Sequence, residues 1–153
     1  MRAVIQRVTN ASVHIEDSLI NSIDSGYMIL LGVGQEDTIE DIEWISKKIA
    51  NLRIFSDADG KMNLNIQQIE GEILMISQFT LYADTSRGNR PGFSEGAGPE
   101  LGNKLYHEAA EELRKYNIPV KMGEFGADMQ ISLTNNGPVT ILLDSDERKK
   151  KRK

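Results

Sequence analysis

The sequence contains no cysteine and only two histidines among its 153 residues. The lack of cysteine excludes disulfides, thiolate catalysis and cysteine-based zinc sites. His14 and His107 form no HExxH motif, and no G-x-S-x-G motif is present to support a Ser-His-Asp triad. Gly32-Val33-Gly34 begins like a dinucleotide-binding loop, but Asp37 occupies the position of the third glycine. We therefore expect neither a metal nor a cofactor.

Long hydrophobic runs are also missing. The longest, such as residues 27–31, are far too short to span a bilayer. Met1 and Arg2 lead directly into an apolar run, without the pattern of a secretory signal. The composition, 39% hydrophobic and 27% charged, is typical of a globular domain with its own core. These features predict a single cytoplasmic domain that does not bind membranes.

Positive charge is scarce outside the last six positions. Six of the 18 Lys and Arg residues lie at 148–153, so the other 147 residues carry 12 basic and 23 acidic side chains and a net charge of −11. Phosphate contacts supply most of the non-specific affinity for nucleic acids, so this acidic body disfavours DNA binding. We expect a folded domain over residues 1–146, followed by a basic, disordered tail over residues 147–153.

Several apolar segments have the length and composition of strands. Residues 2–15 alternate loosely, are rich in Val and Ile, and continue past a turn near Asp17. Continuous apolar runs at 27–33 and 73–76 predict strands that are covered on both faces. Three further strand-like segments end the chain, at 120–125, 129–133 and 139–143.

Two segments have helical periodicity, and a long loop separates them. Asp37 or Thr38 is expected to cap the first helix, with Glu40 or Asp41 completing a capping box. The second helix is expected to begin at Pro99. The stripes that these helices should bury are Ile39, Ile42, Ile45, Ile49 and Leu52, and Leu101, Leu105, Ala109 and Leu113.

The mixed order of strands and helices indicates the fold class. Two amphipathic helices and a larger number of strands, without an internal repeat, predict an α/β or α+β domain in which the helices cover one face of a sheet. Because two helices cannot cover so many strands, we expect a second sheet. Residues 84–98, with five Gly or Pro residues and with Arg87 and Arg90, predict a long surface loop.

Two short polar stretches remain as candidates for chemistry. Ser77-Gln78-Phe79-Thr80 ends a buried strand, where backbone N–H groups can bind an oxyanion without any titrating residue. A nucleophilic Thr80 would need a base, and the sequence identifies none. Asn136-Gly137-Pro138 lies between two apolar runs; an X-Pro bond is usually trans, so the residues alone predict a trans turn.

Both stretches occur together in a known family. Ser77-Gln78-Phe79-Thr80-Leu81 and Asn135-Asn136-Gly137-Pro138-Val139 resemble the signature of the D-aminoacyl-tRNA deacylases, which are chiral proofreading enzymes. The resemblance extends from Met1 to about Asp144 and includes the opening Arg2-Ala3-Val4-Ile5-Gln6-Arg7-Val8 and the stretch Gly88-Asn89-Arg90-Pro91. The basic tail is the one visible departure from it.

The resemblance implies a fold and an oligomeric state. The expected fold is a compact α/β domain with two packed β-sheets, barrel-like, and two main helices over one face, in β/β/α layers. The expected assembly is a homodimer with two active sites at its interface. The resemblance also implies that the Gly137-Pro138 bond is cis and that this pair reaches into the partner's site, where it rejects L-amino acids.

The resemblance also implies roles for individual residues. Ser77, Gln78, Phe79 and Thr80 match the part of the site around the scissile carbonyl, with N–H groups of Phe79 and Thr80 as donors. Arg7 matches a residue that holds the Gly-Pro pair inward, and Phe125 and Met129 match positions beside the aminoacyl group. Arg87 and Arg90 are candidates for contact with the tRNA acceptor end.

The implied reaction is hydrolysis of the ester between a D-amino acid and the terminal adenosine of tRNA. Glycine has no side chain to reject, so glycyl-tRNA is an expected substrate too. Two other hypotheses stay open at this point: a non-catalytic module that binds RNA or aminoacyl-RNA, and a serine or threonine hydrolase that acts through Ser77 or Thr80.

Overall fold

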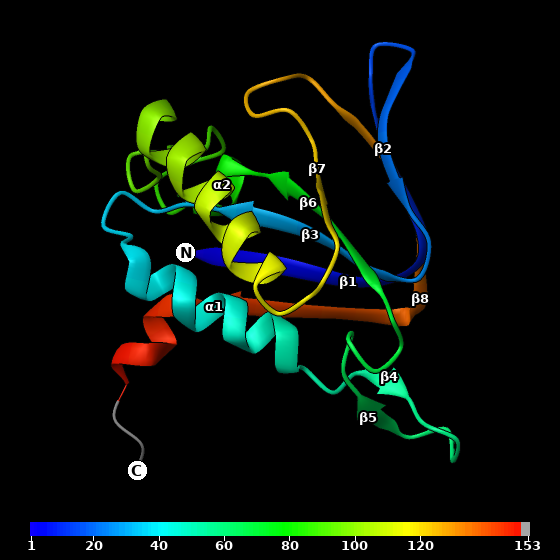
Figure 1. The fold of residues 1–153 in the computed structure, drawn as a ribbon. Helices are drawn as coiled ribbons and strands as arrows, with labels where there is room; N and C mark the ends of the chain where they lie inside the picture. Colours follow the sequence, from blue (N-terminus) through cyan, green and yellow to red (C-terminus); the bar gives the residue numbers. More distant parts are fainter. Residues whose placement is uncertain (151–153) are drawn as a thin grey trace.

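The computed structural model describes residues 1–150, and its fold is organised around one long strand. β1 (Arg2–Ile15) is antiparallel to β8 (Gln130–Asp144) along its whole length. Its first half also pairs with β3 (Gly26–Gly32), and its second half pairs with β2 (Ser18–Ile23). On the other edge of β1 the partner changes from β3 to β2 halfway along the strand. The sheet curls at this point, and β2 turns away from β3 (Figure 1).

The other strands of this sheet are parallel. β6 (Glu72–Ser77) pairs with β3, and β7 (Val120–Met122) pairs with β6. Parallel neighbours need a crossover connection, and α1 (Ile39–Asn51) and α2 (Pro99–Arg114) lie in the two crossovers. Both helices cover the same face of the sheet and contact each other (Figure 1). Because β2 also contacts β6 and β7, the sheet is nearly closed and barrel-like, which confirms the expected fold class.

The short elements lie at the ends of the long ones. β4 (Phe55–Ser56) and β5 (Met62–Leu64) form a separate two-stranded hairpin within the first crossover. The second packed sheet that was expected is not this hairpin: the six-stranded sheet itself curls to supply the barrel-like form. The 3-10 helices η1 (Phe79–Tyr82) and η2 (Ser145–Lys149) directly follow β6 and β8. The expected tail over residues 147–153 therefore begins inside η2, where Arg148 forms ion pairs with residues of α1. Residues 151–153 lie outside the described residues, and disorder there stays a prediction.

Two apolar clusters fill the molecule, one on each side of β1, β3 and β6. The larger cluster packs both helices against the sheet and includes Ile45, Ile49, Leu105 and Leu113. The smaller cluster fills the curl of the sheet, between the second half of β1, β2 and the inner side of β6. Since each residue along a strand faces the opposite side from the next, β6 can be buried on both faces, as its continuous apolar run predicts.

The first helix begins as predicted but buries a slightly different stripe. Thr38 is the N-cap, and Asp41 completes the capping box. Ile42, Ile45 and Ile49 are buried, but the first helical residue, Ile39, is 51% exposed. The expectation for Ile39 was therefore wrong. Ile39 lies on the same side of the helix as Ser46 and Ala50, but it is the first helical residue, and burial along α1 begins only at Asp41.

The end of the chain also differs from the sequence-based prediction. β7 stops at Met122, and the predicted strands at 129–133 and 139–143 are two parts of one strand, β8. The expected turn between them is a bulge in that strand. β8 continues because the 14 residues of β1 pair with it on both sides of the bulge.

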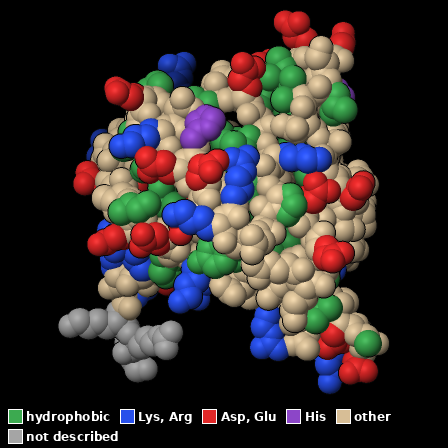
Figure 2. All heavy atoms as spheres, in the orientation of Figure 1, with side chains coloured by type: hydrophobic (Ala, Val, Ile, Leu, Met, Phe, Trp, Pro, Cys, Tyr) green, Lys and Arg blue, Asp and Glu red, His purple; other side chains and the backbone are tan. Residues whose placement is uncertain are grey.

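Charges of both signs are mixed on the outer face of the helices. Lys, Arg, Asp and Glu side chains alternate over α1 and α2 in the view of Figure 2. Such a surface offers no single-sign field to attract a polyanion. Within residues 1–150, no helix combines the length and hydropathy that crossing a membrane requires.

Candidate active site

The four predicted site residues lie where the chain leaves β6. Ser77 is the last residue of that strand, and the N–H of Gln78 still donates to the carbonyl of Leu31 on β3 at 2.8 Å. Phe79 and Thr80 then begin η1. The first N–H groups of a helix have no intrahelical acceptor. The amides of Phe79 and Thr80 are in this position, and neither takes part in the backbone hydrogen bonds outside regular elements.

A cavity of about 590 Å³ opens beside this strand end. Its walls come from the end of β6, the start of η1, the loop before α2 and the connection between β7 and β8. The structure therefore brings together five of the predicted site residues, which line this cavity: Ser77, Gln78, Phe79, Phe125 and Met129.

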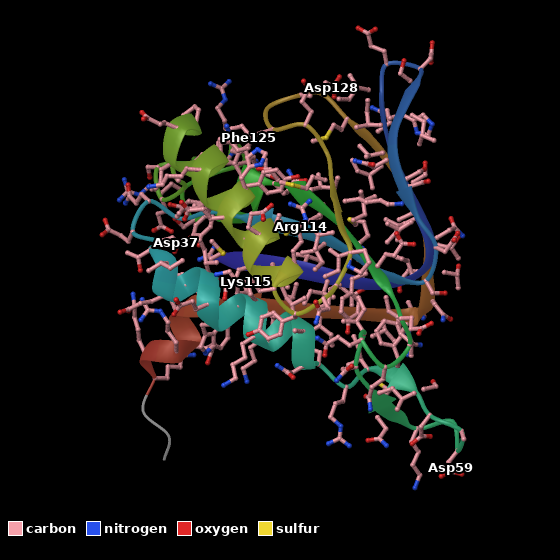
Figure 3. The ribbon with its side chains drawn as sticks, viewed as in Figure 1. Asp37, Asp59, Arg114, Lys115, Phe125 and Asp128 are labelled. Carbon is pink, nitrogen blue, oxygen red and sulfur yellow. The ribbon has the colours of Figure 1, made fainter. Side chains whose placement is uncertain are left out.

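Phe125 and Met129, which lie on the connection between β7 and β8, are closely packed against glycines. Phe125 lies against α2, while Asp128 lies at the outer end of the connection (Figure 3). A Cβ added to Gly102 of α2 would be 3.3 Å from the ring of Phe125, so the glycine lets the ring approach the helix. A Cβ added to Gly123 would be 2.7 Å from the sulfur of Met129. A side chain at either glycine would therefore displace a residue that lines the cavity.

A buried tyrosine ties α2 to the strand that carries the site. The hydroxyl of Tyr106 donates to the carbonyl of Met75 at 2.6 Å, two residues before Ser77. Burial raises the pKa of Tyr106 to about 12, so this hydroxyl keeps its proton at any physiological pH. The hydrogen bond holds the helix and the strand in a fixed relation beneath the cavity.

Sequence reasoning missed two residues at the rim. Phe93 and Phe79 form an edge-to-face pair with ring centroids 5.1 Å apart, and both are exposed. Phe93 comes only two residues after the Gly88–Pro91 stretch on which the resemblance rests, and this proximity could have identified it. Asp128 is the one ionisable side chain among the residues that line the cavity. No motif in the sequence singles it out.

Thr80 follows Phe79 in η1 but is not among the residues that line the cavity, and its hydroxyl accepts a hydrogen bond. The side-chain amide of Gln78 donates to Thr80 Oγ1 at 2.5 Å. Among the described residues, no group of three or more His, Cys, Asp or Glu side chains is arranged to hold a metal. Within residues 1–150, the Thr80 hydroxyl forms a hydrogen bond with Gln78 and with no side chain that could act as a base.

Gly137, Pro138 and Arg7 lie elsewhere, at the bulge in β8. The bond between Gly137 and Pro138 is cis, in agreement with the resemblance. Gly137 has a φ of +136°, and a Cβ at this position would be 2.7 Å from Cγ2 of Val139 and 3.1 Å from Nη2 of Arg7. Only glycine fits here. Arg7 is 8% exposed and donates from Nε to the carbonyl of Asn136 at 2.9 Å.

The bulge is far from the cavity within one chain. Ser77 is in register with Leu31 on β3, which is in register with Ala3 on β1. β8 lies one strand beyond β1, three strand spacings or about 14 Å from β6. The bulge faces Arg7, four residues or about 13 Å further along β1. Measured along the sheet, Ser77 and the bulge are therefore separated by a distance on the order of 15–20 Å.

Arg87 and Arg90 lie on the loop between η1 and α2. Two backbone hydrogen bonds between Asp84 and Gly92, 2.8 and 2.9 Å long, close the base of this loop. Both arginines are exposed, and they belong to the same loop as Phe93 at the cavity rim. Neither arginine is among the residues that line the cavity, so their contact with tRNA stays a prediction.

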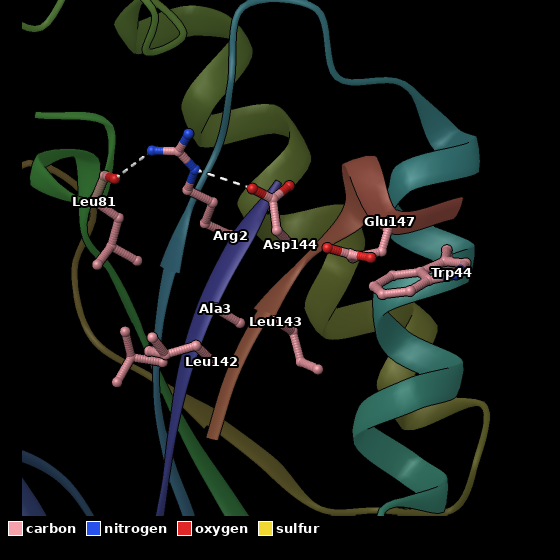
Figure 4. Close-up of a pocket in the computed structure, with 9 residues that line it drawn as sticks. Arg2, Ala3, Trp44, Leu81, Leu142, Leu143, Asp144 and Glu147 are labelled. Carbon is pink, nitrogen blue, oxygen red and sulfur yellow. Dashed lines mark hydrogen bonds and ion pairs between the residues drawn. The ribbon is translucent and has the colours of Figure 1, made fainter. Parts of the chain in front are cut away.

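A second cavity, of about 520 Å³, lies between the start of β1, the end of β8 and α1 (Figure 4). Arg2 borders it and joins two of its walls, donating to the carbonyl of Leu81 at 2.9 Å and to the carboxylate of Asp144 at 3.3 Å. The lining also includes Leu142, whose side chain is 74% exposed. Such an exposed leucine on an edge strand marks a candidate contact surface.

Three comparisons relate this chain to known proteins. The model of a family described as D-Tyr-tRNA(Tyr) deacylase matches residues 4–144. The chain is 54% identical to a D-aminoacyl-tRNA deacylase of Thermosipho africanus over 95% of its length and 97% of the relative. It is also 54% identical to a D-aminoacyl-tRNA deacylase of Staphylococcus saprophyticus, over 97% of this chain and 99% of that one.

Solved structures with similar folds carry two different descriptions. One is described as the c-Myc DNA unwinding element binding protein and is 41% identical, with a TM-score of 0.88 over 94% of this chain and 98% of that chain. Another is described as a probable eukaryotic D-amino acid tRNA deacylase and is 15% identical, with a TM-score of 0.79 over 93% and 97% of the two chains. The second likeness concerns the fold alone.

Proposed function

The chain belongs to the D-Tyr-tRNA(Tyr) deacylase family and is a D-aminoacyl-tRNA deacylase; from this premise we propose how it acts. It hydrolyses the ester of D-aminoacyl-tRNA to a free amino acid and tRNA, and it cleaves glycyl-tRNA as well. The observation that carries the proposal is the convergence of Ser77, Gln78, Phe79, Phe125 and Met129 on one cavity at the end of β6.

The reaction relies on main-chain groups. The unengaged N–H groups of Phe79 and Thr80 bind the oxyanion that forms when water attacks the ester carbonyl. One such donor is typically worth about 10²–10³ in rate. No protein base is required, because the 2′-hydroxyl of the terminal adenosine assists the attacking water. The engagement of the Thr80 hydroxyl by Gln78 supports this division of roles.

Selection between mirror images comes from a second copy of the chain. Gly137 and Pro138 of one copy enter the cavity of the other and meet the α-amino group of the substrate. An L side chain would collide with this fixed wall, whereas a D side chain points out of the cavity. Support comes from the exposure of Gly137 and Pro138 and from their distance, on the order of 15–20 Å, from the cavity of their own chain.

This mode of selection explains a broad substrate range. The wall excludes one configuration without contacting the D side chain, so one site serves many amino acids. Glycine presents no side chain on either side, so glycyl-tRNA passes the same filter. Discrimination then depends on the position of the wall rather than on its affinity for any substrate.

Contact with tRNA is confined to the acceptor end. Support comes from the exposure of Arg87 and Arg90 on the loop that also carries Phe93, and from the net charge of −11 on residues 1–147. This charge opposes extended phosphate contacts. The same charge also argues against DNA binding by this chain, although one similar structure is described as a DNA unwinding element binding protein.

A paired assay tests the proposed function. Purified protein is incubated with D-tyrosyl-tRNA, L-tyrosyl-tRNA and glycyl-tRNA, and release of amino acid is followed against protein-free samples. We expect rapid cleavage of the D and glycyl esters, with the L ester decaying at its spontaneous rate. Binding without cleavage of any ester would instead support a non-catalytic RNA-binding module. Covalent labelling of Ser77 or Thr80 by a fluorophosphonate would support a serine or threonine hydrolase.

A further inference from the structure

The bulge in β8 is held from two sides, and one of them has no assigned role. The ladder between β1 and β8 is regular up to the pair Gln6 and Thr140. The next pair is Val8 and Asn135, and a second, smaller shift follows before the pair Asn10 and Thr134. Arg7 alone fills the gap on β1, whereas four residues fill it on β8, namely 136–139. Three extra residues must therefore be accommodated outside the ladder.

The side chain of Asn135 closes the neck of this bulge. Its Oδ1 accepts from the N–H of Val139 at 2.9 Å, which joins the residues on either side of Gly137 and Pro138. Its Nδ2 donates to Gln6 Oε1 at 2.5 Å and to Thr140 Oγ1 at 3.1 Å. The Thr140 hydroxyl donates to the same Gln6 oxygen at 2.9 Å. We call these three side chains, Gln6, Asn135 and Thr140, the Asn135 clamp.

Apolar packing alone does not determine where the tip of the bulge lies. Asn136, Gly137 and Pro138 are exposed, and Val139 is the one buried residue of the four. Hydrogen bonds must therefore define the position of the tip. Arg7 supplies one of them, to the carbonyl of Asn136, and its Nη1 donates to the carbonyl of Ile54 at 2.6 Å.

The contacts of Arg7 and of the Asn135 clamp are complementary. Arg7 holds the residue that precedes Gly137, from the buried side. The clamp holds the residue that follows Pro138, from the strand edge. Among the described residues, no carboxylate forms an ion pair with Arg7, so its guanidinium is oriented by carbonyl groups alone. If either the Arg7 hydrogen bond or the clamp is removed, the tip keeps only one of its two attachments, and we expect its position to become less well defined.

We propose that the Asn135 clamp is a specificity-determining device: it positions Gly137 and Pro138 and thereby sets how strictly L-aminoacyl esters are excluded. The proposal rests on the proposed function of the Gly-Pro pair as the wall of the partner's cavity. Asn135, Gln6 and Thr140 are positioning residues, since they act through Gly137 and Pro138 and not through contact with the substrate.

The decisive measurement is the ratio of kcat/KM for L-tyrosyl-tRNA to kcat/KM for D-tyrosyl-tRNA. Asn135→Ala removes three hydrogen bonds at the neck of the bulge. We expect the ratio to rise by about tenfold or more, because each lost hydrogen bond loosens the wall. Loss of stability alone would lower both rates together and leave the ratio unchanged.

Graded variants separate the contacts. Asn135→Asp keeps an acceptor for the Val139 N–H but places a second acceptor against Gln6, so we expect a smaller rise. Thr140→Val alters an exposed side chain of the clamp at constant shape and provides the same test if Asn135→Ala does not fold. Thr134→Ala is the matched control: it removes a 3.3 Å hydrogen bond that Asn10 of β1 donates to the residue before Asn135. The Thr134 side chain forms no hydrogen bond with the clamp residues, so the ratio should stay unchanged.

Pro138→Ala distinguishes failure of this inference from failure of the proposed function. A ratio that rises in Pro138→Ala but stays within about twofold of the parent in Asn135→Ala and Thr140→Val overturns the clamp and leaves the wall intact. A ratio that changes in none of these variants overturns the Gly-Pro wall, and the clamp with it. A rise in Pro138→Ala and in the clamp variants, but not in Thr134→Ala, supports the proposal.

Discussion

The hydroxyl of Thr80 accepts a hydrogen bond from Gln78, a residue of the cavity lining, and that lining contains one ionisable side chain, Asp128. A threonine becomes nucleophilic only when a neighbouring base removes its proton. Its backbone N–H, in contrast, needs no activation to stabilise an oxyanion. The contacts of Thr80 are those expected of a residue that contributes its main chain.

Replacing Thr80 by alanine should therefore retain most of the activity. We expect single-turnover cleavage of D-tyrosyl-tRNA by Thr80→Ala to stay within about tenfold of the parent, because the amide donor is unchanged. Thr85→Ala, in the exposed loop that follows, is the control. A decrease of about 10⁴-fold with unchanged tRNA binding would show that the hydroxyl itself is the nucleophile.

Individual site residues were predictable to different degrees. Ser77, Gln78, Phe79, Phe125 and Met129 were identified through the family resemblance, and the fold brings them to one cavity. Phe93 and Asp128 were missed because the shape of a long loop and of the connection between β7 and β8 decides which of their side chains reach the cavity. From local chemistry, the Gly137-Pro138 bond would have been taken as trans.

Among the elements, α1 and η2 are joined by a buried carboxylate. Asp41 accepts hydrogen bonds from the N–H of Thr38, the hydroxyl of Ser145 and Nε of Arg148. Burial by itself raises the pKa of Asp41, but these hydrogen bonds outweigh it and lower the pKa to about 2. The carboxylate therefore ties the start of α1 to the helix that follows β8.

Asp41→Asn should lose stability in a pH-dependent way. A carboxylate with a pKa of about 2 in the folded state and about 3.9 in the unfolded state stabilises the fold by about 2–3 kcal/mol above pH 4. That contribution disappears as the pH falls from about 4 to about 2. We expect urea unfolding at pH 7 to show a lower free energy of unfolding for the variant, with the difference nearly gone at pH 2.

Glu40→Gln provides the control for this prediction. Glu40 also contacts Arg148, but its side chain is 69% exposed, so we expect a change within about 0.5 kcal/mol at pH 7. A difference between the parent and Asp41→Asn that stays constant from pH 7 to pH 2 would contradict the role assigned to the carboxylate.

The elements were largely predictable where local signals agree with the fold. The Thr38–Asp41 capping box, Pro99 at the start of α2 and the strand at residues 2–15 all follow from short-range patterns. The error at β8 has a long-range cause. Asn, Gly and Pro in sequence favour a turn, but pairing with the long strand β1 on both sides of them maintains a single bulged strand.

At the level of the whole molecule, β8 presents an edge with an exposed apolar side chain. Leu142 is 74% exposed and lies on the same strand as Gly137 and Pro138. A second copy that received Gly137 and Pro138 in its cavity would lie against this strand. We therefore predict that, in the proposed dimer, Leu142 and the neighbouring cavity of Figure 4 belong to the contact surface.

Leu142→Glu should weaken the dimer and, with it, the deacylase. A charge at the centre of such a contact typically costs about 2 kcal/mol or more, so we expect the dissociation constant to rise by about 30-fold or more in sedimentation experiments. Leu19→Glu, which alters an exposed leucine on β2, is the matched control. A parent protein that sediments as a monomer at micromolar concentration, with full chiral selectivity, would refute the two-copy arrangement.

The separation of the bulge from the cavity has a genetic consequence. In the proposed arrangement, each active site combines the Gly137-Pro138 bulge of one polypeptide with the cavity of the other. A cell that expressed two alleles, one with a defective bulge and one with a defective cavity, would form heterodimers. In each heterodimer one active site would be intact and the other would carry both defects. Complementation between alleles is thus a property of this architecture.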